Sequence, residues 1–245
     1  MFVKDVQYNR FMKFLRRLFL CILIILFLGA GFLTGSGYLC YRESVNEKSI
    51  LSAVEPYVKD PEFVSFYDID TDFVNAVVAV EDKRFFSRHG FDWVALIRAI
   101  VNNLEAGRAV EGASTITQQT AKNLYYLGKP RGFREKIAEV FIMFEMESHF
   151  SKREIFAIYA NMNYYGDGYW GIGQASRGYF HKDPSDLTIA QAAMLAGIPN
   201  APGRYQWSTG FDLAKKRQEK VLSRMYEDGM ISEKSYQDAM AEKMR

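Results

Sequence analysis

The most prominent feature of the hydrophobic pattern is a run without any charged residue, from Leu18 to Tyr41, which is bounded by Arg17 and Arg42. A helix rises ~1.5 Å per residue, so a run of this length can cross a ~30 Å hydrocarbon core with some tilt. The sequence therefore predicts one transmembrane helix over residues 18–41.

The charges on the two sides of this run differ. Upstream, basic side chains outnumber acidic ones, with Lys4, Arg10, Lys13, Arg16 and Arg17 against Asp5. Cytoplasmic flanks carry the excess of Lys and Arg, which predicts a basic cytoplasmic segment over residues 1–17 and places the chain from about residue 42 on the far side. A cleaved signal peptide is the alternative, but no clean small-x-small cleavage site with a polar start follows, which favours an uncleaved anchor.

Beyond about residue 70, apolar positions recur with the 3.6-residue period of amphipathic helices. One apolar stripe runs from Trp93 to Leu104, where Asp92 can cap the helix and Gly107 can end it. A second stripe of the same period covers residues 133–144.

Two capping boxes indicate further helices, one at Ser151 and one at Thr188, the latter heading an alanine-rich run to Gly197. A last helix is predicted from about Phe211. The β-branched segment 74–80 fits a strand as well as a helix, and residues 42–64 lack strong periodicity and are predicted to be a connecting segment. The pattern as a whole predicts a mostly α fold.

Composition narrows the classes of function. Hydrophobic residues make up 49% of the chain and charged residues 24%, which is ordinary for a folded globular protein. The net charge is +2 and no basic tail is present, which argues against nucleic acid as a partner. Both cysteines, Cys21 and Cys40, fall inside the apolar run, so thiolate metal sites and disulfides are excluded from the rest of the chain.

Three polar runs are candidates for chemistry. Glu81 and Asp82 follow an apolar segment, where partial burial would raise the pKa of a carboxyl towards that of a general base. Taken alone, this run fits a solvated helix end with ordinary ion pairs better.

The second run, residues 112–123, places a glycine and several hydroxyl and amide side chains before a helix whose first amides suit an anion such as phosphate. Lys122 adds a full charge nearby. The simpler alternative for Ser114 is an N-cap. The third run holds Lys136 and Glu139 three residues apart, a spacing that also fits a helix-surface ion pair.

In this order the runs resemble the motifs of the peptidoglycan glycosyltransferases, the domain shared by bifunctional penicillin-binding proteins and monofunctional transglycosylases. The motif E-D-x-x-F-x-x-H-x-G is matched by Glu81, Asp82, Phe85 and Gly90, with Arg88 at the histidine position. The motif G-x-S-T-I-T-Q-Q is matched in full over residues 112–119.

Three later motifs extend the resemblance over residues 65–228. R-K-x-x-E is matched by Lys136 and Glu139, with Glu135 at the arginine position. K-x-x-I-x-x-x-Y-x-N and R-x-x-x-V-L are matched by Lys152, Ile155, Tyr159 and Asn161, and by Arg217, Val221 and Leu222. With no transpeptidase domain after these motifs, the monofunctional form is expected.

The resemblance implies a lysozyme-like helical head with a smaller hydrophobic jaw on the membrane, within a glycosyltransferase domain at 65–245. It implies lipid II, a disaccharide-pentapeptide on undecaprenyl pyrophosphate, as acceptor and the growing lipid-linked glycan as donor, with inversion at the sugar that loses pyrophosphate. It also implies the bacterial inner membrane, a periplasmic catalytic domain and other cell-wall synthesis proteins as partners.

By position, the resemblance makes Glu81 the general base and Glu139 a second catalytic carboxylate at the pyrophosphate. The residues expected to bind substrate are Arg98, Ser114, Gln118, Gln119, Lys122, Arg131 and Lys136. A divalent cation, Mg²⁺ or Mn²⁺, held between Glu139 and the pyrophosphate is the one cofactor it leaves open. Two alternatives remain: a lysozyme-like enzyme that cleaves glycan, and an inactive membrane-anchored scaffold for cell-wall synthesis.

Overall fold

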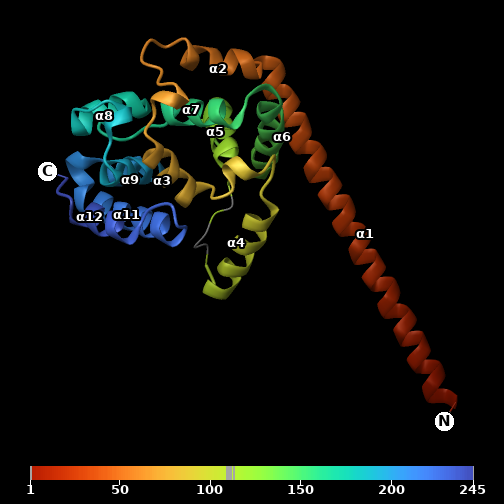
Figure 1. The fold of residues 1–245 in the computed structure, drawn as a ribbon. Helices are drawn as coiled ribbons and strands as arrows, with labels where there is room; N and C mark the ends of the chain where they lie inside the picture. Colours follow the sequence, from red (N-terminus) through yellow and green to blue (C-terminus); the bar gives the residue numbers. More distant parts are fainter. Residues whose placement is uncertain (1, 109–111, 113, 245) are drawn as a thin grey trace.

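The computed structural model describes residues 2–108, 112 and 114–244 (Figure 1). Within these ranges the chain is helical, with no strand beyond an isolated bridge between Tyr164 and Trp170. The prediction of a mostly α fold is confirmed. The ambiguous segment 74–80 lies inside a helix, α3, so the strand alternative is wrong.

The helices follow one another along the chain as α1 (Phe2–Glu47), α2 (Ile50–Val58), α3 (Thr71–Glu81), α4 (Trp93–Ala106), α5 (Ile116–Tyr126), α6 (Phe133–His149), α7 (Lys152–Met162), α8 (Gly171–Phe180), α9 (Ile189–Gly197), α10 (Pro202–Tyr205), α11 (Trp207–Glu227) and α12 (Glu233–Ala241). Short 3₁₀ turns lie at Phe66–Asp68, Phe85–Ser87, Pro184–Asp186 and Ile198–Asn200. The predicted start near Phe211 is confirmed for the long regular part of α11: the backbone of Gly210 is not helical, so the first turn from Trp207 is separated by a kink from the helix that continues at Phe211.

The larger core lies between α3, α7, α9 and α11, on the left in Figure 1. Helix α9 is rich in alanine, and its small side chains let α3 and α11 approach it closely from two sides. Larger side chains such as Phe73, Phe156 and Leu222 fill the space around it and are fully buried. This packing fixes the C-terminal end of α3, where Glu81 lies.

A second, smaller core joins α5 and α6 to the end of α1 and to α2. Ile50 and Ala53 of α2 are buried in it, so the predicted connecting segment over 42–64 contains a helix that packs into this core. Helix α1 continues to Glu47, and Ser49 caps the nine-residue α2. Two turns are too short to produce a clear apolar period, which explains why the sequence pattern missed this helix.

Helix α1 runs without a break through the basic segment and the apolar run. Within it, Met12–Glu47 is long and apolar enough to cross a membrane. From Met12 to Gly35 the side chains are exposed, and from Ser36 the helix packs along α6. There Tyr38 and Tyr41 contact the ring of Phe141, at centroid distances of 5.4 and 5.7 Å. The end of the predicted 18–41 span therefore lies against the protein.

Gly37 is the point of closest approach between α1 and α6. A Cβ atom there would lie 2.3 Å from Cγ2 of Ile137, so we expect Gly37→Leu to force the two helices apart. Overpacking of about 1–3 kcal/mol should speed thiol labelling of the buried Cys40 by roughly tenfold or more, measured in micelles in a Cys21→Ser background. Gly35→Leu is the control, because a Cβ atom at Gly35 meets nothing within 4 Å. Equal labelling in the two variants would contradict this docking.

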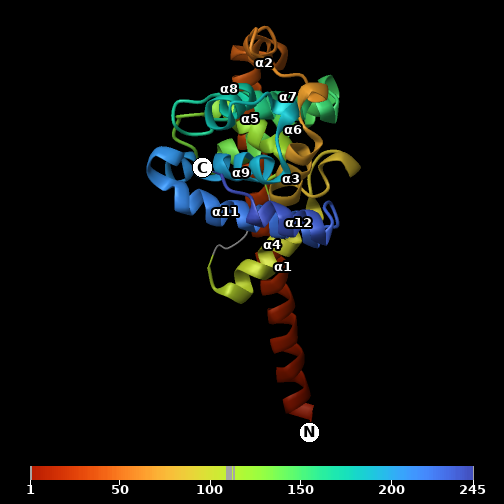
Figure 2. The ribbon, with the colours of Figure 1, turned by 60° about the vertical axis from the view of Figure 1, so that its left-hand side comes forward.

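Helix α4 forms as predicted, between the Asp92 cap and the left-handed Gly107, but its apolar stripe does not face the core. Trp93, Ile97 and Leu104 are 67%, 61% and 76% exposed, and Ala99 is the one buried residue of the helix. Figures 1 and 2 show α4 projecting from the body beside the upper part of α1. An amphipathic period reports one apolar face, but it does not identify what covers that face.

Candidate functional site

Glu81 lies at the C-terminal end of α3, with its side chain 14% exposed. Its Oε2 accepts a hydrogen bond of 2.8 Å from Nε2 of Gln119, and Oε1 lies 3.5 Å from Nη2 of Arg217. Burial raises the pKa of the Glu81 carboxyl, while the Gln119 hydrogen bond and the charges of Arg217 and Lys122 oppose the rise. This is the environment of a carboxylate that takes up a proton more readily than an ordinary glutamate does.

Helix α5 supplies Gln119 and is capped by a box between Thr115 and Gln118. Thr115 Oγ1 accepts from the amide of Gln118 at 3.1 Å, and Gln118 Oε1 accepts from the amide of Thr115 at 2.9 Å. The cap is therefore Thr115, and the alternative that Ser114 is the N-cap is wrong. Gln118 is buried and its side-chain carbonyl closes the box, so within this structure it supports α5.

A second charged cluster surrounds Glu139, which is fully buried on α6. Its Oε1 accepts from Nη1 of Arg131 at 2.8 Å, and its Oε2 accepts from Nζ of Lys136 at 2.9 Å. Lys136 also donates to Oγ of Ser114, at 2.9 Å. The alternative that Lys136 and Glu139 form an ordinary helix-surface ion pair is wrong, because the carboxylate of Glu139 is buried.

Lys122 connects the two clusters. Burial lowers the pKa of its ammonium group, and the nearby charges of Arg131 and Lys136 lower it further. The carboxylates of Glu139 and Glu81 act in the opposite direction, so both are close enough to interact with Lys122. Cations thus outnumber the carboxylate around Glu139, and this part of the site can take a dianionic group such as a diphosphate.

Arg98 lies on α4 with its side chain exposed, and the cations that contact Glu81 and Glu139 come from α11 and from the segment 131–136 instead. Glu135, which occupies the arginine position of the third motif, accepts the amide of Gly132 and caps α6. Arg134 is exposed and pairs with Glu135, so the guanidinium that reaches Glu139 is that of Arg131.

Two side chains near the site, those of Arg217 and Lys152, were not predicted to have a role there. Arg217 was matched to a motif but was given no role, although it shares a helix face with the buried Val221 four residues on, a spacing that turns it towards the core. Lys152 was also matched to a motif without a role; its side chain is 12% exposed, pairs with Glu147 at 2.5 Å and lies 4.7 Å over the ring of Phe85.

Gly197 makes room for Arg217. A Cβ atom at Gly197 would lie 2.8 Å from Cγ of Arg217, so we expect Gly197→Ala to displace this side chain from Glu81. The unfolding free energy should fall by about 1–3 kcal/mol, and the pKa of Glu81 should rise because an opposing cation has moved away. The acid limb of the pH–activity profile should then lie at higher pH in Gly197→Ala than in the wild type. Gly203→Ala is the control, since its Cβ atom meets nothing within 4 Å; an unshifted acid limb in Gly197→Ala would contradict the contact.

The donor set around Glu139 does not fit a divalent cation by itself. Both carboxylate oxygens are engaged by Arg131 and Lys136, whereas Mg²⁺ and Mn²⁺ need free oxygen ligands. In the part of the chain that the structure describes, no group of three or more His, Cys, Asp or Glu side chains lies close enough to hold a metal ion.

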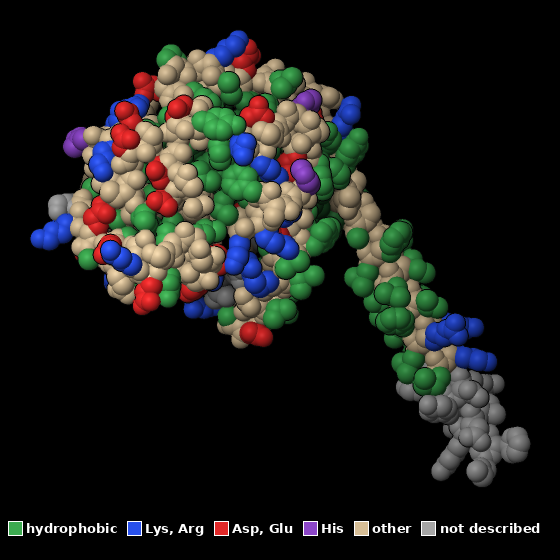
Figure 3. Space-filling view, viewed as in Figure 1, with side chains coloured by type: hydrophobic (Ala, Val, Ile, Leu, Met, Phe, Trp, Pro, Cys, Tyr) green, Lys and Arg blue, Asp and Glu red, His purple; other side chains and the backbone are tan. Residues whose placement is uncertain are grey.

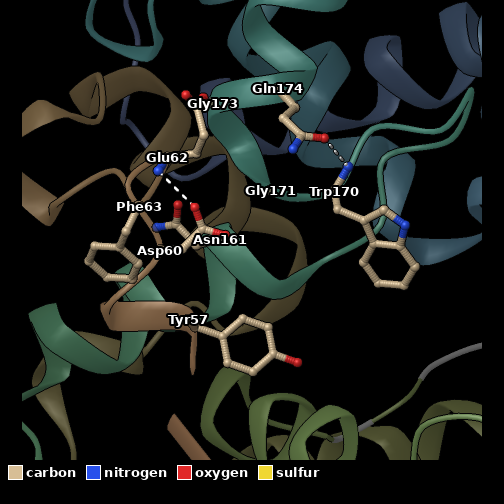
Figure 4. A pocket seen from close by; sticks show the side chains of 9 residues that line it. All are labelled: Tyr57, Asp60, Glu62, Phe63, Asn161, Trp170, Gly171, Gly173 and Gln174. Atoms are coloured by element: carbon tan, nitrogen blue, oxygen red, sulfur yellow. Dashed lines mark hydrogen bonds between the residues drawn. The ribbon is translucent and has the colours of Figure 1, made fainter. Parts of the chain in front are cut away.

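A separate pocket lies between the segment after α2 and the start of α8, with Tyr57 and Trp170 at its rim (Figure 4). Asn161, from the fourth motif, lines it and holds both backbone groups of Val64. None of the residues predicted to be catalytic or substrate-binding lines this pocket. Asn161 therefore acts here as a tie between segments.

Comparison with known proteins identifies the family of the chain. The family described as Transglycosylase matches residues 47–226. Penicillin-binding protein 1A of Neisseria flavescens is 40% identical over 183 residues, which cover 75% of this chain and 23% of the relative. The predicted transglycosylase H16_A0665 of Cupriavidus necator is 35% identical over 234 residues, 96% of this chain and 99% of the relative.

The chain thus spans about a quarter of the length of the penicillin-binding proteins it matches. A crystal structure of penicillin-binding protein 1A from Haemophilus influenzae is 33% identical, with a TM-score of 0.36 over 38% of this chain and 14% of that chain. The match of the family over most of the chain, and the full-length similarity to the Cupriavidus protein, are decisive. The chain belongs to the transglycosylase family and is, by that membership, a glycosyltransferase.

Proposed function

We propose that this protein polymerises glycan strands from lipid II, with the growing lipid-linked strand as donor and undecaprenyl pyrophosphate as leaving group. The observation that carries the proposal is the pairing of two unlike centres. One is a buried carboxylate with a raised pKa, Glu81, and the other is a cluster of cations around Glu139.

Glu81 fits the role of general base. The acceptor's sugar hydroxyl is a weak nucleophile, so a positioned carboxylate must take its proton as the new glycosidic bond forms. Gln119 and Arg217 hold the two carboxylate oxygens from α5 and α11, which restricts the orientation of the group. The hydroxyl attacks the donor's anomeric carbon from the side opposite the diphosphate, and configuration at that carbon inverts.

The cluster around Glu139 fits the departing diphosphate. Negative charge builds up on the leaving oxygen, and preorganised cations stabilise charge that develops in the transition state. Lys122, Arg131 and Lys136 supply these cations, and Glu139 holds the last two in place. Because both oxygens of Glu139 are already engaged, no step of this mechanism is routed through a metal ion.

The membrane anchor suits a substrate that stays in the bilayer. The exposed apolar side chains of α1 and the basic side chains directly before them, at the edge of the grey N-terminal part, can be followed in Figure 3. By the positive-inside rule the N-terminus lies in the cytoplasm, and the catalytic part lies on the periplasmic face of the inner membrane. Helix α4 would place Trp93, Ile97 and Leu104 in the same bilayer.

Two substrates separate this proposal from its alternatives. Purified protein in detergent is incubated with lipid II and, separately, with polymeric glycan. Formation of long glycan strands from lipid II is expected, with no release of soluble fragments from the polymer. Release of fragments would identify a glycan-cleaving enzyme, and inertness towards both substrates would favour the scaffold.

A further inference from the structure

The loop between α3 and α4 is held by one cation at the position where the first motif has histidine. Arg88 is 12% exposed, and its guanidinium donates to a carboxylate oxygen of Asp82 and to the carbonyl of Gly90. Its Nε lies 3.3 Å from Oδ2 of Asp92, the residue that caps α4. The side chain therefore contacts the end of one helix, the start of the next, and the loop between them.

Asp82 connects Arg88 to the start of α5. Its Oδ2, which pairs with Arg88, also accepts the amide of Ile116 at 3.1 Å. Ile116 is the first residue of α5, and Gln119, one turn later, holds Glu81. Arg88 and Glu81 are therefore linked through one carboxylate and one helical turn.

A histidine could not make these contacts. Imidazole carries one N–H when neutral and two when charged, whereas guanidinium offers five in a planar fork and stays charged at any working pH. We propose that Arg88 is a positioning residue that fixes α5 relative to Glu81 through Asp82, and so sets the rate of the reaction. This inference rests on the proposed function.

The contacts of Asp82 should depend on pH, because charged groups surround its carboxylate. Three groups face the Asp82 carboxylate: the guanidinium of Arg88 from the loop, the ammonium of Lys152 from α7 and the amide of Ile116 from α5. Two other carboxylates are near: Glu81 precedes Asp82 in the chain, and Glu147 of α6 pairs with Lys152. Burial raises the pKa of Asp82, and Arg88, Lys152 and the Ile116 amide oppose that rise. Removal of Arg88 must therefore raise the pKa of Asp82 further.

Arg88→Met is the test variant. We expect its kcat with lipid II to fall roughly 10- to 100-fold at pH 7, the range that a small misplacement of a catalytic group produces. A protonated Asp82 binds the Ile116 amide less strongly than the carboxylate does, so activity should recover as the pH rises and Asp82 ionises. Arg84→Met is the matched control, because Arg84 pairs with Asp92 of the same loop but not with Asp82. It should keep the wild-type pH profile.

Stability should follow the opposite trend. With its pKa raised in the folded state, Asp82 destabilises the variant increasingly as the pH rises through that pKa, so its deficit in Tm should grow towards alkaline pH. Both trends should vanish when Arg88→Met is combined with Asp82→Asn. Arg88→Lys, which keeps a cation on Asp82, should retain the wild-type profile and serves if the methionine variant does not fold.

Three outcomes would overturn the inference: a loss of activity that is equal at every pH, the same shift in Arg84→Met, or a shift that persists in the Asp82→Asn background. The melting curves do not depend on the reaction. If the wild type fails to polymerise lipid II while the Tm trends hold, the proposed function fails and the Arg88–Asp82 restraint stands; flat Tm trends would remove the restraint itself.

Discussion

Glu81→Gln should lower kcat for polymerisation of lipid II by about 10²- to 10⁴-fold, the contribution typical of a general base. Glutamine keeps the size of the side chain and can still accept from Gln119, so substrate binding should change little and KM should stay within a few-fold. The loss is then one of proton transfer. The measurement is the initial rate of strand formation against lipid II concentration.

The pH profile of the wild type provides a second test. A base acts in its ionised form, and burial raises the pKa of Glu81 above its usual range. The acid limb of kcat/KM should therefore lie above the pH at which an ordinary glutamate titrates, about 4.3. It should be absent from the residual activity of Glu81→Gln. Glu227→Gln, an exposed carboxylate on α11, is the matched control and should keep both rate and profile.

Stability should change in the direction opposite to activity. A carboxyl whose pKa is raised by folding stabilises the protein below its unfolded pKa, and this contribution is lost as the pH rises through the folded pKa. Above its folded pKa the ionised Glu81 therefore opposes folding, and there Glu81→Gln should melt at the same temperature as the wild type or higher. A lower Tm together with the loss of activity would indicate damage to the fold and would remove the case for Glu81 as base.

Local sequence signals predicted several helix boundaries and the position of the candidate base. The capping boxes at Ser151 and Thr188 formed as predicted, because such a box needs only residues three positions apart. The sequence also placed Glu81 at the end of an apolar segment, although only the structure shows that this segment is a helix. These features depend on neighbours within one turn, which a single sequence contains.

Contacts between distant segments were not readable. Arg217 lies far along the chain from Glu81, and only the packing of α11 beside α3 brings them together. The stripe of α4 showed an apolar face but gave no sign that it would stay outside the core. Lys152 lies in the first turn of its helix, where side chains are commonly solvated, yet it pairs with Glu147 from α6 and lies over the ring of Phe85.

Lys136→Met should lower kcat by about 10²- to 10³-fold, the effect of removing one preorganised group that stabilises transition-state charge. Lys136 is the cation that joins Glu139 to Ser114, so its loss also leaves the buried Glu139 with one hydrogen-bonded cation, Arg131, and with Lys122 nearby. Affinity for lipid II should fall less than kcat, because the diphosphate carries most charge once its bond to the sugar has broken.

Arg134→Met separates this role from a general effect of positive charge. Arg134 lies two residues away on the same helix, but it is exposed and pairs with Glu135. Its removal should change kcat by less than about threefold, as expected for a surface ion pair. Lys136→Arg restores the charge and should recover part of the rate. If Lys136→Met and Arg134→Met lost activity equally, the cations would act only by attracting an anionic substrate, and the cluster around Glu139 would have no part in the departure of the diphosphate.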